Sequence, residues 1–318
     1  MTLQAAPIRM AIVGAGRVGS SIAFASLIRG VARHIALYDV DASKVRAEVL
    51  DLSHGRQFVP AAEVTGGDDL AVCRDADVVV ITAGASQRPG QSRLDLVRTN
   101  VEICRALVPE LVRLAPRAVL LLVTNPVDVL THVCREISGW PSERVFGTGT
   151  TLDTSRFRHA LAGRCEVAVT NVHAFIVGEH GDSELPVWSS ATIAGATVDD
   201  WLASRGRPLR AGEREEIFAG VRDAAHEIIR GKGATHYAIG LTAARILEAV
   251  LDDERVVMPV SAAVGGDHGL PPVTLSLPRV VGRQGAGELA PIRLSAAEGK
   301  ALHGSAGAIR AVCASVGF

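Results

Sequence analysis

The chain has 318 residues, of which 48% are hydrophobic and 21% are charged, and its formal charge is -1. This length exceeds the ~250–300 residues at which a single core stops growing, so we expect two domains. The balanced charge argues against nucleic acid or a membrane surface as the partner and favours a small molecule.

The beginning of the chain and its cysteines indicate a cellular compartment. The stretch "MTLQAAPIRMAIVGAG" leads straight into a strand, and no apolar run approaches the ~18 residues of a membrane span. The cysteines are widely spaced, lack a C-x-x-C pair and suggest neither a disulfide framework nor a metal site: Cys73, Cys104, Cys134, Cys165 and Cys313. We expect a cytoplasmic protein with reduced, buried thiols and no metal.

The first half of the chain alternates short apolar runs with helix-like segments. Strands are predicted at 9–13, 34–39, 76–84 and 118–126, and helices at 17–30, 42–55 and 93–114. Apolar runs of this kind are typical of a parallel sheet that is buried on both faces. The predicted fold class is α/β, with a doubly wound parallel Rossmann sheet.

After residues 144–149, "RVFGTG", the pattern changes to mixed strands and longer amphipathic helices. Helices are predicted at 213–233 and 235–253, strands at 255–264 and 271–281, and a closing helix from Ser295. We place the domain boundary near Gly147. The prediction is an NAD-binding Rossmann domain over residues 1–147 and an α+β substrate or catalytic domain over residues 148–318.

A glycine-rich turn in "AIVGAGRVGSS" predicts the cofactor site. Gly14, Gly16 and Gly19 have G-x-G-x-x-G spacing, with Val18 between them, directly after a strand and at the start of a helix. Such a turn lets the backbone approach a pyrophosphate at the helix N-terminus. Asp39 ends the next strand, where a carboxylate binds ribose hydroxyls and repels a 2′-phosphate, so NAD is favoured over NADP. A turn used only for helix packing is the alternative.

Several longer runs carry a resemblance to a known family. They include "TAGASQRPGQSRLDLVRTN", "TNPVDVLTHV", "GTGTTLDTSRFRHALA", "NVHAFIVGEHGDSELPVW" and "GKGATHYAIG". Together with the glycine turn they make the chain similar to the bacterial L-lactate dehydrogenases of the lactate/malate dehydrogenase family, from the first strand to the last helix. The resemblance implies hydride transfer between NAD and the 2-carbon of a small 2-hydroxy or 2-keto acid.

His180 stands between Glu179 and Asp182, and by itself it would more often be an ordinary satisfied histidine. The resemblance implies that it is the proton relay, a role that suits a group titrating near neutrality. Asp153 is implied to hold the imidazole in one tautomer and to stabilise its protonated form, which is compatible with a helix N-cap. Arg156 is expected near Asp153 on the same helical face, where the resemblance assigns it to the substrate carboxylate.

The resemblance assigns four further residues to the substrate and the nicotinamide. Arg93 lies in a segment similar to the family's closing loop, where it polarises the substrate carbonyl. Asn125 contacts the reacting region beneath the nicotinamide, and the bond to Pro126 is expected to be cis. Ile239 is implied to pack on the nicotinamide, and Thr235 to line the far end of the substrate pocket; ordinary surface, turn or packing roles are the alternatives.

Gln87 is the expected determinant of substrate choice. In the family, a glutamine here accompanies a short apolar tail, as in pyruvate, whereas an arginine pairs with the second carboxylate of oxaloacetate. Arg88 is a complication, because a one-residue shift in the loop would bring its charge into the pocket. Malate or a bulkier 2-hydroxy acid is therefore kept as an alternative to lactate.

Two residues suggest regulation. Arg158 and His173 match the pair that binds the phosphates of fructose 1,6-bisphosphate at a subunit interface in activated bacterial members of the family. The resemblance also implies a homotetramer. The resemblance thus predicts an allosterically activated L-lactate dehydrogenase. The alternative hypothesis is a non-catalytic NAD-binding protein.

Overall fold

The computed structural model describes residues 7–85 and 93–318, with the side chain of Arg93 left out. The elements of the first half are β1 (Arg9–Val13), α1 (Arg17–Arg29), β2 (His34–Tyr38), α2 (Ala42–His54), β3 (Glu63–Gly67), β4 (Val78–Ile81), α3 (Arg93–Leu114), β5 (Val119–Leu122), α4 (Val127–Ser138) and β6 (Val145–Gly147). Short 3-10 helices occupy Arg56–Phe58, Leu70–Cys73 and Ser142–Arg144.

The second half begins with α5 and ends with the long helix α9. Its helices are α5 (Thr151–Cys165), α6 (Val198–Ala203), α7 (Glu213–Lys232), α8 (Tyr237–Leu251) and α9 (Ala296–Ser315). Its strands are β7 (Val172–His173), β8 (Ile176–Val177), β9 (Leu185–Pro186), β10 (Thr192–Ile193), β11 (Ala196–Thr197), β12 (Val256–Val264), β13 (Val273–Gly282) and β14 (Gly285–Leu289). The closing helix α9 begins where it was predicted, because the Ser295 side chain caps it by accepting a hydrogen bond from the backbone nitrogen of Glu298.

A large mixed sheet is the centre of the molecule. Strands β3-β2-β1-β4-β5-β6 lie in this order and are all parallel, which is the doubly wound Rossmann arrangement. The predicted fold class is therefore confirmed. The sheet continues beyond β6 through the antiparallel strands β12, β13 and β14, so one sheet joins the two halves of the chain.

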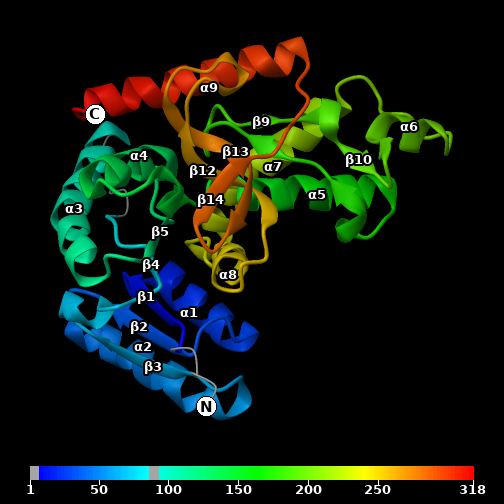
Figure 1. Ribbon diagram of the computed structural model, residues 1–318. Helices are drawn as coiled ribbons and strands as arrows, with labels where there is room; N and C mark the ends of the chain where they lie inside the picture. Colours follow the sequence, from blue (N-terminus) through cyan, green and yellow to red (C-terminus); the bar gives the residue numbers. More distant parts are fainter. Residues whose placement is uncertain (1–6, 86–92) are drawn as a thin grey trace, which may run out of the picture.

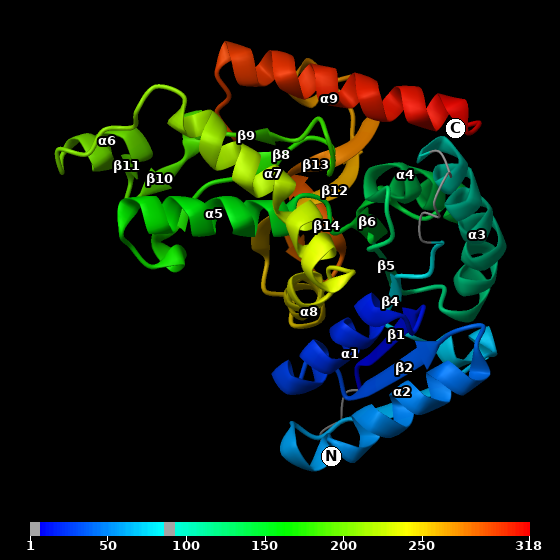
Figure 2. The same cartoon turned by 180° about the vertical axis from the view of Figure 1, so that it is seen from behind.

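Helices cover both faces of the parallel strands, as the apolar runs predict (Figure 1). The strand residues of β1 and β4 are almost completely buried, and they divide between two apolar clusters on the opposite faces of the sheet. A third cluster, built around Phe157 and Leu161 of α5, fills the second half. In the view from behind, α8 lies against α1, which brings a helix of the second half onto the Rossmann part (Figure 2).

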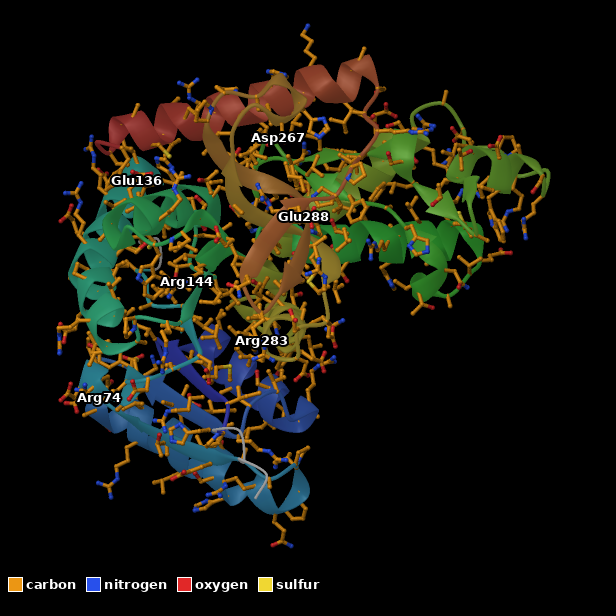
Figure 3. All side chains as sticks on the ribbon, viewed as in Figure 1. Arg74, Glu136, Arg144, Asp267, Arg283 and Glu288 are labelled. Carbon is orange, nitrogen blue, oxygen red and sulfur yellow. The ribbon has the colours of Figure 1, made fainter. Side chains whose placement is uncertain are left out.

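Charged side chains of both signs are spread over the two halves, as the net charge suggests. The labelled examples are Arg74, Glu136, Arg144, Asp267, Arg283 and Glu288 (Figure 3). All five cysteines are buried free thiols. Within the described ranges, no helix has the length and apolar character needed to cross a membrane.

Candidate active site

The glycine turn between β1 and α1 is shaped by steric necessity. Gly14 has a φ of +109°, and a Cβ there would lie 2.6 Å from the backbone nitrogen of Ala83, after β4. At Gly19 a Cβ would lie 1.9 Å from the Gly14 carbonyl oxygen. Gly16 is open on this side, since the nearest atom is Lys44 Nζ at 3.9 Å. The turn therefore exposes backbone at the N-terminus of α1, which is the cradle that a pyrophosphate requires.

Asp39 lies beside this turn, at the end of β2. Its Oδ2 accepts hydrogen bonds from the Ala15 backbone nitrogen at 2.8 Å and from Lys44 Nζ at 3.0 Å. Burial opposes ionisation, but hydrogen bonds from the Asp41 backbone nitrogen and Lys44 hold the pKa of Asp39 below its ordinary value. The charged carboxylate next to the glycine cradle fits the ribose end of NAD. Lys44, on α2, was not singled out from the sequence.

His180 and Asp153 form the central pair of the second half. Asp153, in the first turn of α5, is 2% exposed, and its Oδ2 accepts a hydrogen bond from His180 Nδ1 at 2.6 Å. This contact places the proton on Nδ1 of the neutral ring and directs Nε2 away from the carboxylate. Burial disfavours the charged imidazole, yet the Asp153 carboxylate outweighs this and raises the pKa of His180 to about 9. The His180 side chain is 27% exposed, so a small molecule can reach it.

Arg156 joins the pair from the next turn of α5. Its Nη1 donates to Asp153 Oδ1 at 2.8 Å, which is the proximity predicted from the three-residue spacing. Burial favours the neutral acid at Asp153, but the charges of His180 and Arg156 lower its pKa below the ordinary value. Arg156 is 16% exposed and keeps further donors for a carboxylate.

Glu184 is a buried member of the same cluster that the sequence reading missed. Burial, and then the negative charge of Asp153, raise the pKa of Glu184 to about 8, so the side chain is a neutral acid at pH 7. Its Oε1 has no hydrogen-bond partner among the described residues. Ligand atoms of Asp153, His180 and Glu184 lie within 4.8 Å of one another. Because Asp153 already accepts from an imidazole and a guanidinium, the arrangement suits proton transfer.

Asn125 lies between β5 and α4, at the carboxyl edge of the sheet. The Asn125–Pro126 peptide bond is cis, as expected. The backbone oxygen of Asn125 accepts from Asn100 Nδ2 at 2.9 Å, and Asn100 Oδ1 accepts from the Ala85 backbone nitrogen at 2.8 Å. Asn100 is 1% exposed and was also missed. It connects α3 with the ends of two neighbouring strands, where ligands bind in this fold.

Thr235 lies just before α8 and Ile239 lies in its first turn, and both are half-buried. Ile239 packs, with Val18 of α1, against the apolar cluster behind the glycine turn. The close approach of the two helices depends on Gly240, where a Cβ would lie 2.8 Å from Ser21 Cβ. The N-terminal end of α8, with Ile239 in it and Thr235 just before it, is therefore held beside the cofactor turn.

Two predicted substrate residues cannot be placed. Gln87 lies outside the described residues, as does Arg88. The backbone of Arg93 begins α3, while its side chain is not described.

The two residues expected to bind an effector line one groove. Arg158, on α5, is largely buried and donates from Nε to the Ala174 carbonyl at 2.9 Å. Burial lowers the pKa of its guanidinium from the ordinary value. His173 of β7 lines the same groove, of about 430 Å³, together with Thr170 and Arg245. The groove is distinct from the cluster around His180, although both use α5.

Fold and site together define a class of protein: a Rossmann domain with a dinucleotide cradle, joined to a half that carries a histidine–aspartate pair. The model of the lactate/malate dehydrogenase NAD binding domain matches residues 8–147, and that of the family's alpha/beta C-terminal domain matches residues 150–316. The chain belongs to the lactate/malate dehydrogenase family. It is therefore an NAD-dependent oxidoreductase.

Individual relatives are similar over nearly the whole chain. An L-lactate dehydrogenase of Bifidobacterium animalis subsp. lactis is 49% identical over 98% of both chains. One of Synechococcus sp. is 48% identical over 96% of this chain and 98% of its own. The crystal structure of the minor L-lactate dehydrogenase from Enterococcus mundtii superposes with a TM-score of 0.94 at 39% identity, covering 97% of this chain and 98% of that one.

Proposed function

We propose that the protein is an NAD-dependent L-lactate dehydrogenase that interconverts pyruvate and L-lactate. The observation that carries the proposal is the 2.6 Å hydrogen bond from His180 Nδ1 to Asp153, which leaves Nε2 to exchange a proton with a substrate oxygen. When bound, the nicotinamide supplies or accepts the hydride at the substrate 2-carbon. The relatives named L-lactate dehydrogenase support this choice of reaction.

In the proposed reaction the protein handles the proton and the charges. During reduction, the protonated His180 donates from Nε2 to the carbonyl oxygen, and Asp153 stabilises the imidazolium that exists before the transfer. Arg156 binds the substrate carboxylate through the donors that Asp153 does not occupy. Arg93 polarises the carbonyl, Asn125 contacts the reacting region, and both complete the binding site.

The proposed cofactor site combines Gly14, Gly16, Val18 and Gly19 for the pyrophosphate with Asp39 for the ribose. Ile239 packs against the same apolar cluster as Val18, and we assign it to the nicotinamide. We assign residues 1–147 to this NAD-binding domain and residues 148–318 to the catalytic domain.

Substrate choice is assigned to Gln87 and Thr235, two uncharged residues that the family resemblance implies at the substrate pocket. A pocket end without a cation disfavours a second buried carboxylate, so pyruvate is preferred to oxaloacetate. The test is NADH oxidation with each keto acid over a wide concentration range, for the wild type and for Gln87→Arg. A higher kcat/KM for pyruvate, reversed in the variant, is expected. Preference of the wild type for oxaloacetate would mean malate chemistry, and no turnover would favour a non-catalytic binder.

We also propose that fructose 1,6-bisphosphate activates the enzyme through Arg158 and His173. The support is the groove of about 430 Å³ that both residues line, where the guanidinium groups of Arg158 and Arg245 offer cationic donors. Saturating fructose 1,6-bisphosphate should lower the pyruvate concentration at half-saturation, and Arg158→Gln should remove the effect. An unchanged half-saturation in the wild type would reject this regulation.

A homotetramer completes the proposal. Large apolar side chains of α1, α2 and the following 3-10 helix are exposed: Phe24, Ile28, Leu50 and Phe58. Large apolar side chains exposed on neighbouring segments are typical of an interface between subunits. Sedimentation with and without effector tests the assembly.

The buried free thiols favour a reducing cytoplasm.

A further inference from the structure

A second buried carboxylate lies beneath His180, and the proposed mechanism does not use it. Asp128 is in the first turn of α4 and is 2% exposed. Its Oδ2 accepts the backbone N–H of His180 at 2.7 Å, and its Oδ1 accepts the Ser261 hydroxyl of β12 at 2.6 Å. One side chain thus joins a helix of the Rossmann half, the loop that carries His180, and a strand of the second half.

Asp128 and Asp153 hold the same histidine at different atoms. Asp153 accepts from the ring at Nδ1, whereas Asp128 accepts from the backbone nitrogen. With both the peptide and the ring fixed, the imidazole has little freedom to rotate. Asp128 also follows Asn125 by three residues, so its contact connects His180 directly to the segment assigned to the nicotinamide.

The electrostatic surroundings of Asp128 are those of a buried anion. Burial raises the pKa of Asp128 to about 6, against the hydrogen bonds from Ser261 and the His180 backbone, which favour the charged form. Above that pH the carboxylate adds its negative charge to that of Asp153 near the imidazole. Two further titratable groups interact with Asp128. The negative charge of Glu179 raises the pKa of Asp128, and Asp128 adds to the burial that raises the pKa of the Cys313 thiol.

We propose that Asp128 is a positioning residue for the reaction: it fixes His180 through the peptide N–H and presents a second buried negative charge to the imidazole. The inference rests on the proposed function for its kinetic consequences only. The charge acts on the protonated form of His180, so removing it weakens proton retention even when the geometry is kept.

The test is Asp128→Asn, which is nearly isosteric. The amide oxygen can still accept from the His180 backbone, and the amide nitrogen can donate to the Ser261 hydroxyl, so the contacts survive while the charge is lost. The pH at which kcat/KM for pyruvate falls by half should drop by about 1 pH unit, the low end for an opposite charge within ~4–6 Å. KM for NADH should stay the same.

Glu179→Gln is the matched control. It removes one negative charge from the residue next to His180 in the chain, but this carboxylate accepts from the Ser183 hydroxyl and not from His180. Because Glu179 acts on His180 only through space and through Asp128, its pH midpoint should move by much less than that of Asp128→Asn. An unchanged midpoint in Asp128→Asn, or an equal shift in Glu179→Gln, would overturn the proposal.

A titration without turnover separates this inference from the proposed function. With ¹³C-labelled histidine, and with the His180 signal assigned by its loss in His180→Gln, the imidazole midpoint should fall by the same amount in Asp128→Asn. This result would stand even if the wild type did not reduce pyruvate. If the asparagine variant does not fold, the wild-type titration decides. Protonation of Asp128 at acid pH should then add a second step to the His180 signal, and a single step would contradict the proposal.

Discussion

The glycine turn and the His180 cluster solve opposite problems. The turn consists of backbone within one short stretch, and it works because side chains are missing at Gly14 and Gly19. The cluster consists of charged side chains from α4, α5 and the loop after β8, and it works because their charges are buried together. Substitutions in the turn should therefore act sterically on cofactor binding, whereas substitutions in the cluster should act electrostatically on proton transfer.

The largest expected effect is that of His180→Gln. Glutamine cannot supply the proton, so kcat for pyruvate should fall by roughly 10²–10⁴-fold, the usual contribution of a general acid. NADH affinity, measured by fluorescence titration, should be unchanged because the turn is intact. His226→Gln, an exposed histidine of α7, is the control and should keep full activity. Turnover near the wild-type rate in His180→Gln would remove His180 from the mechanism.

Gly19→Ala tests the other side of the comparison. Its Cβ would lie 1.9 Å from the Gly14 carbonyl oxygen, so the turn must shift. We expect the free energy of unfolding to fall by ~1–3 kcal/mol, as for overpacked cores, and the Kd for NADH to rise. Gly16→Ala is the matched control, since its Cβ meets only Lys44 Nζ at 3.9 Å, and chemical denaturation should give nearly the wild-type stability. An equal loss of unfolding free energy in Gly19→Ala and Gly16→Ala would contradict the steric account.

The pH dependence sharpens the electrostatic side. Since the pKa of His180 is raised to about 9, the imidazole is protonated below that pH and loses its proton above it. kcat/KM for pyruvate should then fall about tenfold per pH unit above 9, while lactate oxidation, which needs the neutral ring, should increase through the same range. A midpoint at or below 6.5 for pyruvate would show that Asp153 does not stabilise the imidazolium.

Glu184→Gln should have the smallest effect. Because the pKa of Glu184 is raised to about 8, the acid is neutral at pH 7 and glutamine resembles it. Activity at pH 7 should change by less than ~3-fold, because glutamine is also uncharged and has nearly the same shape as the neutral acid. The two proteins should differ mainly above pH 8, where the wild type gains a negative charge near His180. A large loss at pH 7, measured by steady-state kinetics, would mean that the glutamate is already ionised there.

The comparison also explains which site residues could be read from the sequence. Gly14, Gly19 and Asp39 are close in the chain, and the alternation of apolar strands and helices predicted the sheet that carries them. The contact between Asp153 and Arg156 followed from helical spacing. Asp128 and Glu184 gave no such signal, because their roles depend on burial and on contacts between distant segments, such as that of Asp128 with Ser261 and that of Glu184 with Asp153.

Sequence alone was enough to predict the Rossmann strands, the glycine turn and the family, because these depend on local periodicity, on the absence of side chains and on long matching runs. Only the folded chain shows that β12–β14 extend the same sheet past β6, and that α8 lies on α1. It also shows that two carboxylates hold His180 at two different atoms. The physical reason is that the proton affinity of a buried group depends on charges brought close by folding, and those distances are not encoded in any single stretch of the chain.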